Sequence, residues 1–155
     1  SSICWAFRMD VVFYNRSDVS DLPFDATQLD TLPAVLRTAD VVVLAVPATP
    51  QTHHIMDAAA FAAMKPGGYL VNIARGDVVE ERALIAALQE GQIAGAGLDV
   101  YEFEPQVPQA LRDMENVTLL PHLGTSAQEV REEMGLLAVA NLVAFFKDGQ
   151  ALNPV

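Results

Sequence analysis

The sequence predicts an α/β fold built on a mostly parallel sheet with helices on both faces. Short apolar runs of strand length alternate along the chain with patterns typical of helices. The run at 41–46 is unbroken and rich in valine, which is typical of a strand buried on both faces. Alternating strands and helices form βαβ units, and their right-handed crossovers place helices against the sheet.

Each predicted element follows from a local pattern. Apolar and β-branched residues predict strands at 11–14, 41–46, 69–73, 94–100 and 117–120. Helices are predicted at 28–37, 57–64 and 80–90. Pro33 is expected to break or shift the first helix, Asp57 to cap the second, and Gly91 to follow the end of the third.

A long helix is predicted near the C-terminus, from the segment at 126–129 to Lys147. Ser126-Ala127-Gln128-Glu129 matches the capping-box pattern that begins many helices. Helical spacing predicts one apolar face for this helix, formed by Val130, Met134, Leu137, Leu142 and Phe145.

The composition excludes several classes of protein. The chain has 155 residues with 20 acidic and 9 basic side chains, which gives a net charge of −11. This balance argues against non-specific binding to nucleic acid or to anionic membranes. A single cysteine, Cys4, excludes an internal disulfide and a cysteine-cluster metal site, and we predict no metal. We also expect no membrane span and no secretory signal, which makes the cytoplasm the expected location.

Polar and ionisable side chains follow the predicted strands. Ligands in parallel sheets bind outside the carboxyl ends of the strands, so we expect Arg16, Arg75, Asp99, Glu104 and His122 to lie at one rim. An arginine can hold a carboxylate with two hydrogen bonds, and a histidine can exchange a proton near neutral pH. A neighbouring carboxylate can fix the imidazole tautomer and raise the imidazole pKa. These residue types predict acid/base chemistry on an anionic substrate.

Three strings carry a resemblance to a known family: Val71-Asn72-Ile73-Ala74-Arg75-Gly76-Asp77-Val78-Val79, Gly97 to Pro105, and Pro121-His122-Leu123-Gly124. Their order and spacing resemble the D-isomer-specific 2-hydroxyacid dehydrogenase family, from Phe7 to Val155. That family holds a nicotinamide cofactor on a Rossmann domain and a substrate in a cleft against a second domain. The resemblance implies an oxidoreductase that transfers a hydride between NADP(H) and a small 2-keto or 2-hydroxy acid, such as glyoxylate or hydroxypyruvate.

The resemblance also assigns roles to individual residues. Arg75 matches the arginine that anchors the substrate, and His122 matches the general acid/base. Glu102 and Glu104 are both candidates for the carboxylate partner of the histidine, and Glu104 is preferred because it precedes Pro105. The implied cofactor-binding residues are Val46, Pro47, Thr52, Ala74, Asp99 and Gly124. Asp99 is the one expected to meet the nicotinamide carboxamide. His53 and His54 follow a loop rich in proline and threonine and are interpreted as surface residues.

The residues after the first predicted strand bear on the choice of cofactor. In Rossmann sites an acid at this position accepts hydrogen bonds from the adenosine ribose, which favours NAD. This chain has Asn15 there, which removes the repulsion against a 2′-phosphate. Arg16 and Ser17 can supply a charge-assisted hydrogen bond and a hydroxyl donor. The Asn-Arg-Ser string resembles the NADP-preferring glyoxylate and hydroxypyruvate reductase branch, so NADP is predicted over NAD.

The glycine-rich fingerprint of dinucleotide-binding domains lies about 20 residues before the ribose-binding position, and counting back from Asn15 passes the start of the chain. Residues 1–155 are therefore predicted to be a partial dinucleotide-binding domain, with a C-terminal helix and tail at 126–155. The first strand, the glycine-rich loop and the N-terminal substrate domain are expected to be absent. Because the first strand is central in the order 3-2-1-4-5-6, strands 2 and 3 should separate from strands 4 to 6.

Two further expectations concern the start of the chain and its activity. Arg8 stands where the family commonly has a glycine, at a position suited to a left-handed backbone. The chain alone is expected to have little dehydrogenase activity, because the pyrophosphate-binding loop is missing. The resemblance also implies a homodimer and a small 2-keto acid as the partner molecule. Two alternatives remain open: a non-catalytic dinucleotide-domain module of the corepressor type, and a phosphoglycerate-type dehydrogenase.

Overall fold

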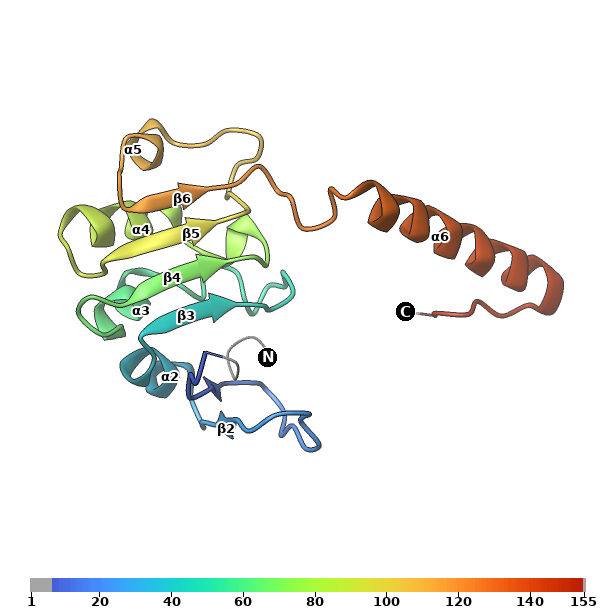
Figure 1. The fold of residues 1–155 in the computed structure, drawn as a ribbon, viewed down its shortest axis with the longest axis horizontal. Helices are drawn as coiled ribbons and strands as arrows, with labels where there is room; N and C mark the ends of the chain where they lie inside the picture. The colour runs from blue at the N-terminus through green and yellow to red at the C-terminus, as the bar shows by residue number, and fades with distance from the viewer. Residues whose placement is uncertain (1–6, 155) are drawn as a thin grey trace. The chain divides into compact units, whose positions relative to one another are not determined.

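The computed structural model describes residues 7–154, which form two compact units. The first unit ends at Leu120 and contains every strand of the described chain, and the second begins at Pro121. Figure 1 shows the first unit as a layer of side-by-side strands with helices packed against it. None of the helices within residues 7–154 is long and apolar enough to cross a membrane.

The larger sheet has four parallel strands in the order β3-β4-β5-β6 (Figure 1). They are β3 (Val41–Leu44), β4 (Tyr69–Asn72), β5 (Gly95–Leu98) and β6 (Val117–Leu119). Because the strands are parallel, their carboxyl ends lie at one edge of the sheet, so the segments that follow them meet there. The predicted parallel α/β fold is confirmed.

A second sheet pairs β1 (Val12–Phe13) with β2 (Thr27–Gln28), also in parallel. It is not hydrogen-bonded to the larger sheet, so the strands do fall into two groups. The predicted grouping is wrong, because it placed the strand at 41–46 with the strand at 11–14, and β3 pairs instead with β4 of the larger sheet. The sequence pattern predicts a helix beginning at Gln28, so β2 is an unexpected element. Helix α2 instead runs over Leu32–Thr38, and the Thr31 side chain caps it by accepting a hydrogen bond from the Ala34 amide. Pro33 lies in the first turn, where its missing N–H costs no helical hydrogen bond.

Local signals at three turns are confirmed. Asp57 caps α3 (Ala58–Ala63) by accepting a hydrogen bond from the Ala60 amide at 2.8 Å. Gly91 has a φ of 67° just beyond α4 (Glu81–Gln89), as expected for a helix that ends in a left-handed residue. Arg8 has a φ of 57°, a conformation that is costly for a residue with a side chain and easy for glycine.

The two faces of the larger sheet differ. Val42 and Leu44 of β3 are buried in a core formed with α2, α3 and α4. Val41 and Val43 point the other way and are 39% and 54% exposed, so the prediction that this strand is buried on both faces is wrong. Helices were predicted on both faces, and within the described first unit they pack on one. The order β3-β4-β5-β6 advances in one direction, so each right-handed crossover returns on the same side.

The second unit consists mainly of α6, which runs over Gln128–Asp148. Its predicted extent is confirmed, but the capping box is wrong. Ala127 is the N-cap, with no side-chain hydrogen bond to the helix, because the Ser126 hydroxyl donates to the carbonyl of Leu123 instead. Apolar side chains of this helix are not confined to the predicted face. Leu136 and Phe146 lie outside the predicted face and are exposed apolar side chains as well.

Candidate functional site

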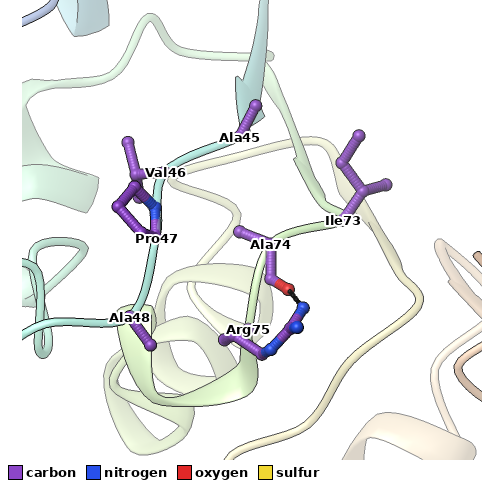
Figure 2. A pocket seen from close by; sticks show the side chains of 7 residues that line it. All are labelled: Ala45, Val46, Pro47, Ala48, Ile73, Ala74 and Arg75. Carbon is purple, nitrogen blue, oxygen red and sulfur yellow. Dashed lines mark hydrogen bonds between the residues drawn. The ribbon is translucent and has the colours of Figure 1, made fainter. Parts of the chain in front are cut away.

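A pocket lies at the carboxyl ends of β3 and β4. Its volume is about 520 Å³, and its lining residues come from the two segments that follow these strands: Ala45, Val46, Pro47, Ala48, Ile73, Ala74 and Arg75 (Figure 2). The volume is in the range typical of small-molecule sites, about 300–1,000 Å³. Four residues that the sequence analysis singled out, Val46, Pro47, Ala74 and Arg75, are thus brought to one place.

The turn that presents Arg75 is built on a buried asparagine. Asn72 is 1% exposed at the end of β4, where its side-chain oxygen accepts from the Ala74 amide and its side-chain nitrogen donates to the Arg75 carbonyl, both at 3.0 Å. The exposed Arg75 guanidinium donates to the Ala74 carbonyl at 2.7 Å (Figure 2). A guanidinium has five N–H donors, so this bond uses one of them. Sequence reasoning missed Asn72, although a polar residue inside an apolar strand is a usable signal.

Gly76 brings the Arg75 turn against the segment that follows β5. A Cβ atom built on Gly76 lies 1.8 Å from the carbonyl oxygen of Tyr101 and 2.4 Å from the backbone nitrogen of Glu102. Only glycine fits such an approach between two backbones. Arg75 and the segment carrying Glu104 are therefore held together at this rim of the sheet.

The segment after β5 is held in a compact turn. A side-chain oxygen of Glu104 accepts from the Tyr101 amide at 3.0 Å, and the buried Tyr101 hydroxyl donates to the carbonyl of Leu120 at 2.8 Å. Burial, followed by the charge of Asp99, raises the pKa of Tyr101, so its hydroxyl remains a donor over the physiological range. Asp99 itself is placed by its amide, which donates to the carbonyl of Asn72 at 3.0 Å.

His122 and Gly124 lie in the second unit, just after the end of β6. His122 has a φ of 55°, in the left-handed region that is uncommon for residues other than glycine. Such conformations cost energy and cluster at functional sites, which is consistent with the role that the sequence analysis gave to His122. Arg75 and Glu104 belong to the first unit.

Thr52 organises the loop that follows β3. Its hydroxyl donates to the Pro47 carbonyl at 2.6 Å and accepts from the Thr49 amide at 2.9 Å. These bonds close the loop on itself, so the hydroxyl has a role in shaping the segment predicted to run along the cofactor.

The loop after β1 contains the predicted cofactor-selective residues Asn15, Arg16 and Ser17. Asn15 donates through its side-chain nitrogen to the carbonyl of Ser17 at 3.0 Å. Gln28 of β2 donates to the same carbonyl at 3.0 Å and accepts from the Val19 amide at 2.9 Å. Gln28 therefore holds this loop in place. Sequence reasoning missed its role because it assigned Gln28 to a helix.

The interpretation of His54 as a surface residue holds only in part, because the residue is partly exposed. Its side chain is 30% exposed, and its Nε2 lies 2.8 Å from an oxygen of Glu102. The amide of His54 donates to the carbonyl of Asp77 at 2.9 Å, with a φ of 50°, which fixes the turn at this residue. His53 remains exposed, and its ring stacks on that of His54 with centroids 3.9 Å apart. Among residues 7–154, no group of three or more histidine, cysteine or acidic side chains could hold a metal ion.

Glu81 is a buried acid at the start of α4 and provides a pH-dependent test. Burial, and then the charge of Glu102, raise its pKa above the ordinary value of 4.5, against the lowering effect of a hydrogen bond from the Glu102 amide. Because the pKa of Glu81 is raised in the folded state, folding favours the protonated form of this carboxyl. The stability that the carboxyl contributes is complete below pH 4.5 and is lost as the pH rises through its pKa in the folded state.

Glu81→Gln keeps an oxygen that can accept from Glu102 and removes the charge. We expect this variant to have a higher free energy of unfolding than the parent chain at pH 7 and an equal one at pH 4, measured by urea unfolding. Glu115→Gln is the matched control, because Glu115 is exposed. The prediction would be contradicted if Glu81→Gln were less stable than the parent chain by the same amount at pH 7 and at pH 4.

Comparison with known proteins decides the family. The model of the D-isomer specific 2-hydroxyacid dehydrogenase NAD binding domain matches residues 1–124. The chain belongs to this family. It is 41% identical to a hydroxyphenylpyruvate reductase of Plectranthus scutellarioides over 150 residues, which are 97% of this chain and 47% of that protein. It is 44% identical to a glyoxylate reductase of Pyrococcus furiosus over 140 residues, which are 90% of this chain and 42% of that protein.

A solved structure agrees with the fold of this dehydrogenase-family chain. It is an NADPH-dependent glyoxylate/hydroxypyruvate reductase from Sinorhizobium meliloti in complex with NADP and malonate. It superposes with a TM-score of 0.94 at 41% identity, covering 99% of this chain and 48% of that one. The dehydrogenase-family chain therefore has a Rossmann-like fold and spans about half the length of the curated relatives it matches.

Proposed function

We propose that this protein is an oxidoreductase that transfers a hydride between NADP(H) and a small 2-keto or 2-hydroxy acid such as glyoxylate or hydroxypyruvate. The observation that carries the proposal is the pocket at the ends of β3 and β4, where Arg75 lies beside Val46, Pro47 and Ala74. Family membership and relatives named as glyoxylate reductases support the reaction class. The proposal also includes a homodimer in the cytoplasm. Analytical sedimentation measures the number of subunits.

The residues present fit a nicotinamide dinucleotide at two points. The pocket beside Ala74 is roomy enough for a ring of nicotinamide size, with Asp99 following the neighbouring strand β5. The loop after β1 has amide, guanidinium and hydroxyl donors suited to a phosphate on the adenosine ribose. When bound, the cofactor supplies or accepts the hydride at the substrate C2 atom.

The chain's own residues would bind and orient the acid and move its proton. The Arg75 guanidinium would hold the substrate carboxylate with two charge-assisted hydrogen bonds. His122 would exchange a proton with the oxygen on C2, acting as an acid in reduction and as a base in oxidation. Glu104 would accept a hydrogen bond from the imidazole of His122 and stabilise its protonated form. Apolar residues such as Val46 and Pro47 would limit the access of water.

A hybrid enzyme tests the proposal directly. In this hybrid, the chain replaces the matched 140-residue segment of the glyoxylate reductase of Pyrococcus furiosus. We expect it to oxidise NADPH with glyoxylate or hydroxypyruvate, and the isolated chain to do so weakly or not at all. Arg75→Gln in the hybrid should raise the KM for the keto acid. A folded hybrid that binds NADPH without turning over any 2-keto acid would favour the non-catalytic module instead.

The preference for NADP is proposed to depend on Arg16. Arg16→Ala in the hybrid should weaken NADPH binding about 10- to 100-fold, because one charge-assisted hydrogen bond to a phosphate contributes about 1.5–3 kcal/mol. NADH lacks the 2′-phosphate, so its affinity should change little. Calorimetric titration of the parent and the variant with both cofactors gives the ratio. An unchanged ratio of the two affinities would overturn the assignment of Arg16.

A further inference from the structure

Glu102 joins three segments of the chain in the first unit. Its Oε1 lies 2.8 Å from Nε2 of His54, in the loop after β3, and its Oε2 accepts from the amide of Glu81 at 3.1 Å. In return, the Glu102 amide donates to Oε1 of Glu81 at 3.0 Å. The Glu102 side chain is 13% exposed, and Glu81 is 5% exposed. A single side chain therefore ties the cofactor-side loop and the start of α4 to the segment that follows β5.

A carboxylate suits this position because both of its oxygens are acceptors. One oxygen meets a main-chain N–H at the start of α4, where a helix has amide donors without intrahelical partners. The other meets an imidazole nitrogen, which donates when it carries a proton. Hydrogen bonds to an ionised carboxylate are stronger than neutral ones, so these two contacts oppose movement of the segment.

The contacts of Glu102 with His54 and Glu81 form a clamp, and this clamp lies immediately beside Glu104 in the sequence. Tyr101, the residue before Glu102, donates its amide to the Glu104 carboxylate at 3.0 Å. The same Tyr101 carbonyl and Glu102 amide form the backbone against which Gly76 packs. A movement of the Glu102 backbone would therefore also move the Tyr101 amide, which donates to Glu104. It would also move the backbone against which Gly76, the neighbour of Arg75, packs.

We propose that Glu102, held by His54 and Glu81, is a positioning residue that sets the place of the Glu104 carboxylate. What Glu104 does there rests on the proposed function, and the clamp itself does not. Both Glu102 and Glu104 are candidates in the sequence for the carboxylate partner of the histidine, and in the structure the two side chains make different contacts. Glu104 faces its own turn through Tyr101, while Glu102 binds the two neighbouring segments.

Two substitutions separate positioning from simple stabilisation. Glu102→Ala removes both acceptors. Glu102→Gln keeps an oxygen for the Glu81 amide and places a nitrogen donor opposite His54, which a neutral imidazole can accept. Glu115→Ala is the control, because Glu115 is an exposed acid in the loop before β6.

The test is amide hydrogen exchange, followed by NMR on the full 155-residue chain. In Glu102→Ala we expect the Tyr101 amide, the donor to Glu104, to exchange at least ten-fold faster, with amides of β4 and β5 unchanged. Glu102→Gln should restore slow exchange at Tyr101, and Glu115→Ala should match the parent chain. Faster exchange at Glu81 with no change at Tyr101 would overturn the proposal, and so would equal acceleration throughout the sheet.

The hybrid enzyme adds a second readout. There, Glu102→Ala should lower kcat at least ten-fold with little change in the KM for the keto acid, and Glu102→Gln should recover most of the loss. An inactive parent hybrid would refute the proposed function, whereas the exchange of Tyr101 still decides the role of Glu102. A parent hybrid whose kcat is unaffected by Glu102→Ala would refute the positioning role alone.

Discussion

Replacing Gly76 with alanine is expected to lower the free energy of unfolding by about 3 kcal/mol, the upper part of the usual range for overpacking. A Cβ atom at this position would lie 1.8 Å from the carbonyl oxygen of Tyr101. The obstacle is backbone rather than a flexible side chain, so the whole segment after β5 must move away. Urea unfolding followed by circular dichroism measures the loss.

Gly135→Ala is the matched control for this substitution. Gly135 lies inside α6, and a Cβ atom there meets nothing within 4 Å. Alanine is favoured over glycine in a helix by about 0.5–1 kcal/mol, so this variant should be slightly more stable. If Gly76→Ala proved as stable as the parent, the close approach of the Arg75 turn to the segment after β5 would be refuted.

Replacing His122 with asparagine should lower kcat of the hybrid enzyme about 10²- to 10⁴-fold, the usual contribution of a general acid/base. Asparagine suits the test because it tolerates the left-handed backbone better than most residues, and His122 has a φ of 55°. The variant therefore removes the proton-exchanging group with little added strain. Stopped-flow measurement of NADPH oxidation at saturating keto acid gives kcat directly.

Cofactor affinity is the internal control for His122→Asn. It should stay within a few-fold of the parent, because the proposed role of His122 concerns the substrate oxygen. Retention of kcat within ten-fold of the parent would contradict the assignment of His122 as the acid/base.

Much of the fold was predictable because local signals agreed with the tertiary structure. The Asp57 cap, the Gly91 turn and the left-handed Arg8 each depend on interactions within a few residues, and all are confirmed. A division of the strands into two groups was also predictable, but its position was not, because β3 joins the larger sheet and β1 pairs with β2. Local pattern failed at Thr27–Gln28, because a two-residue strand carries too little periodicity to distinguish it from a helix start.

The candidate site was predictable in part. Arg75, Ala74, Pro47 and Val46 were named from strand ends and motif strings, and they line one pocket. Their supporting residues were not found. Asn72 is a single polar residue in an apolar strand, and its hydrogen bonds to the Arg75 turn become visible only when the backbone path is known.

The sequence by itself determined the family, the parallel α/β class and the chemical residue types at the strand ends, because these depend on motif strings and periodicity along the chain. Only the tertiary structure decided which side chains meet across it. His54 and Glu102 are 48 positions apart, and Glu81 and Glu102 are 21 apart. Their pairing results from how parallel strands bring distant loops to one edge of the sheet, which no local pattern records. The same holds for Val41 and Val43, whose exposure depends on which face the crossovers cover.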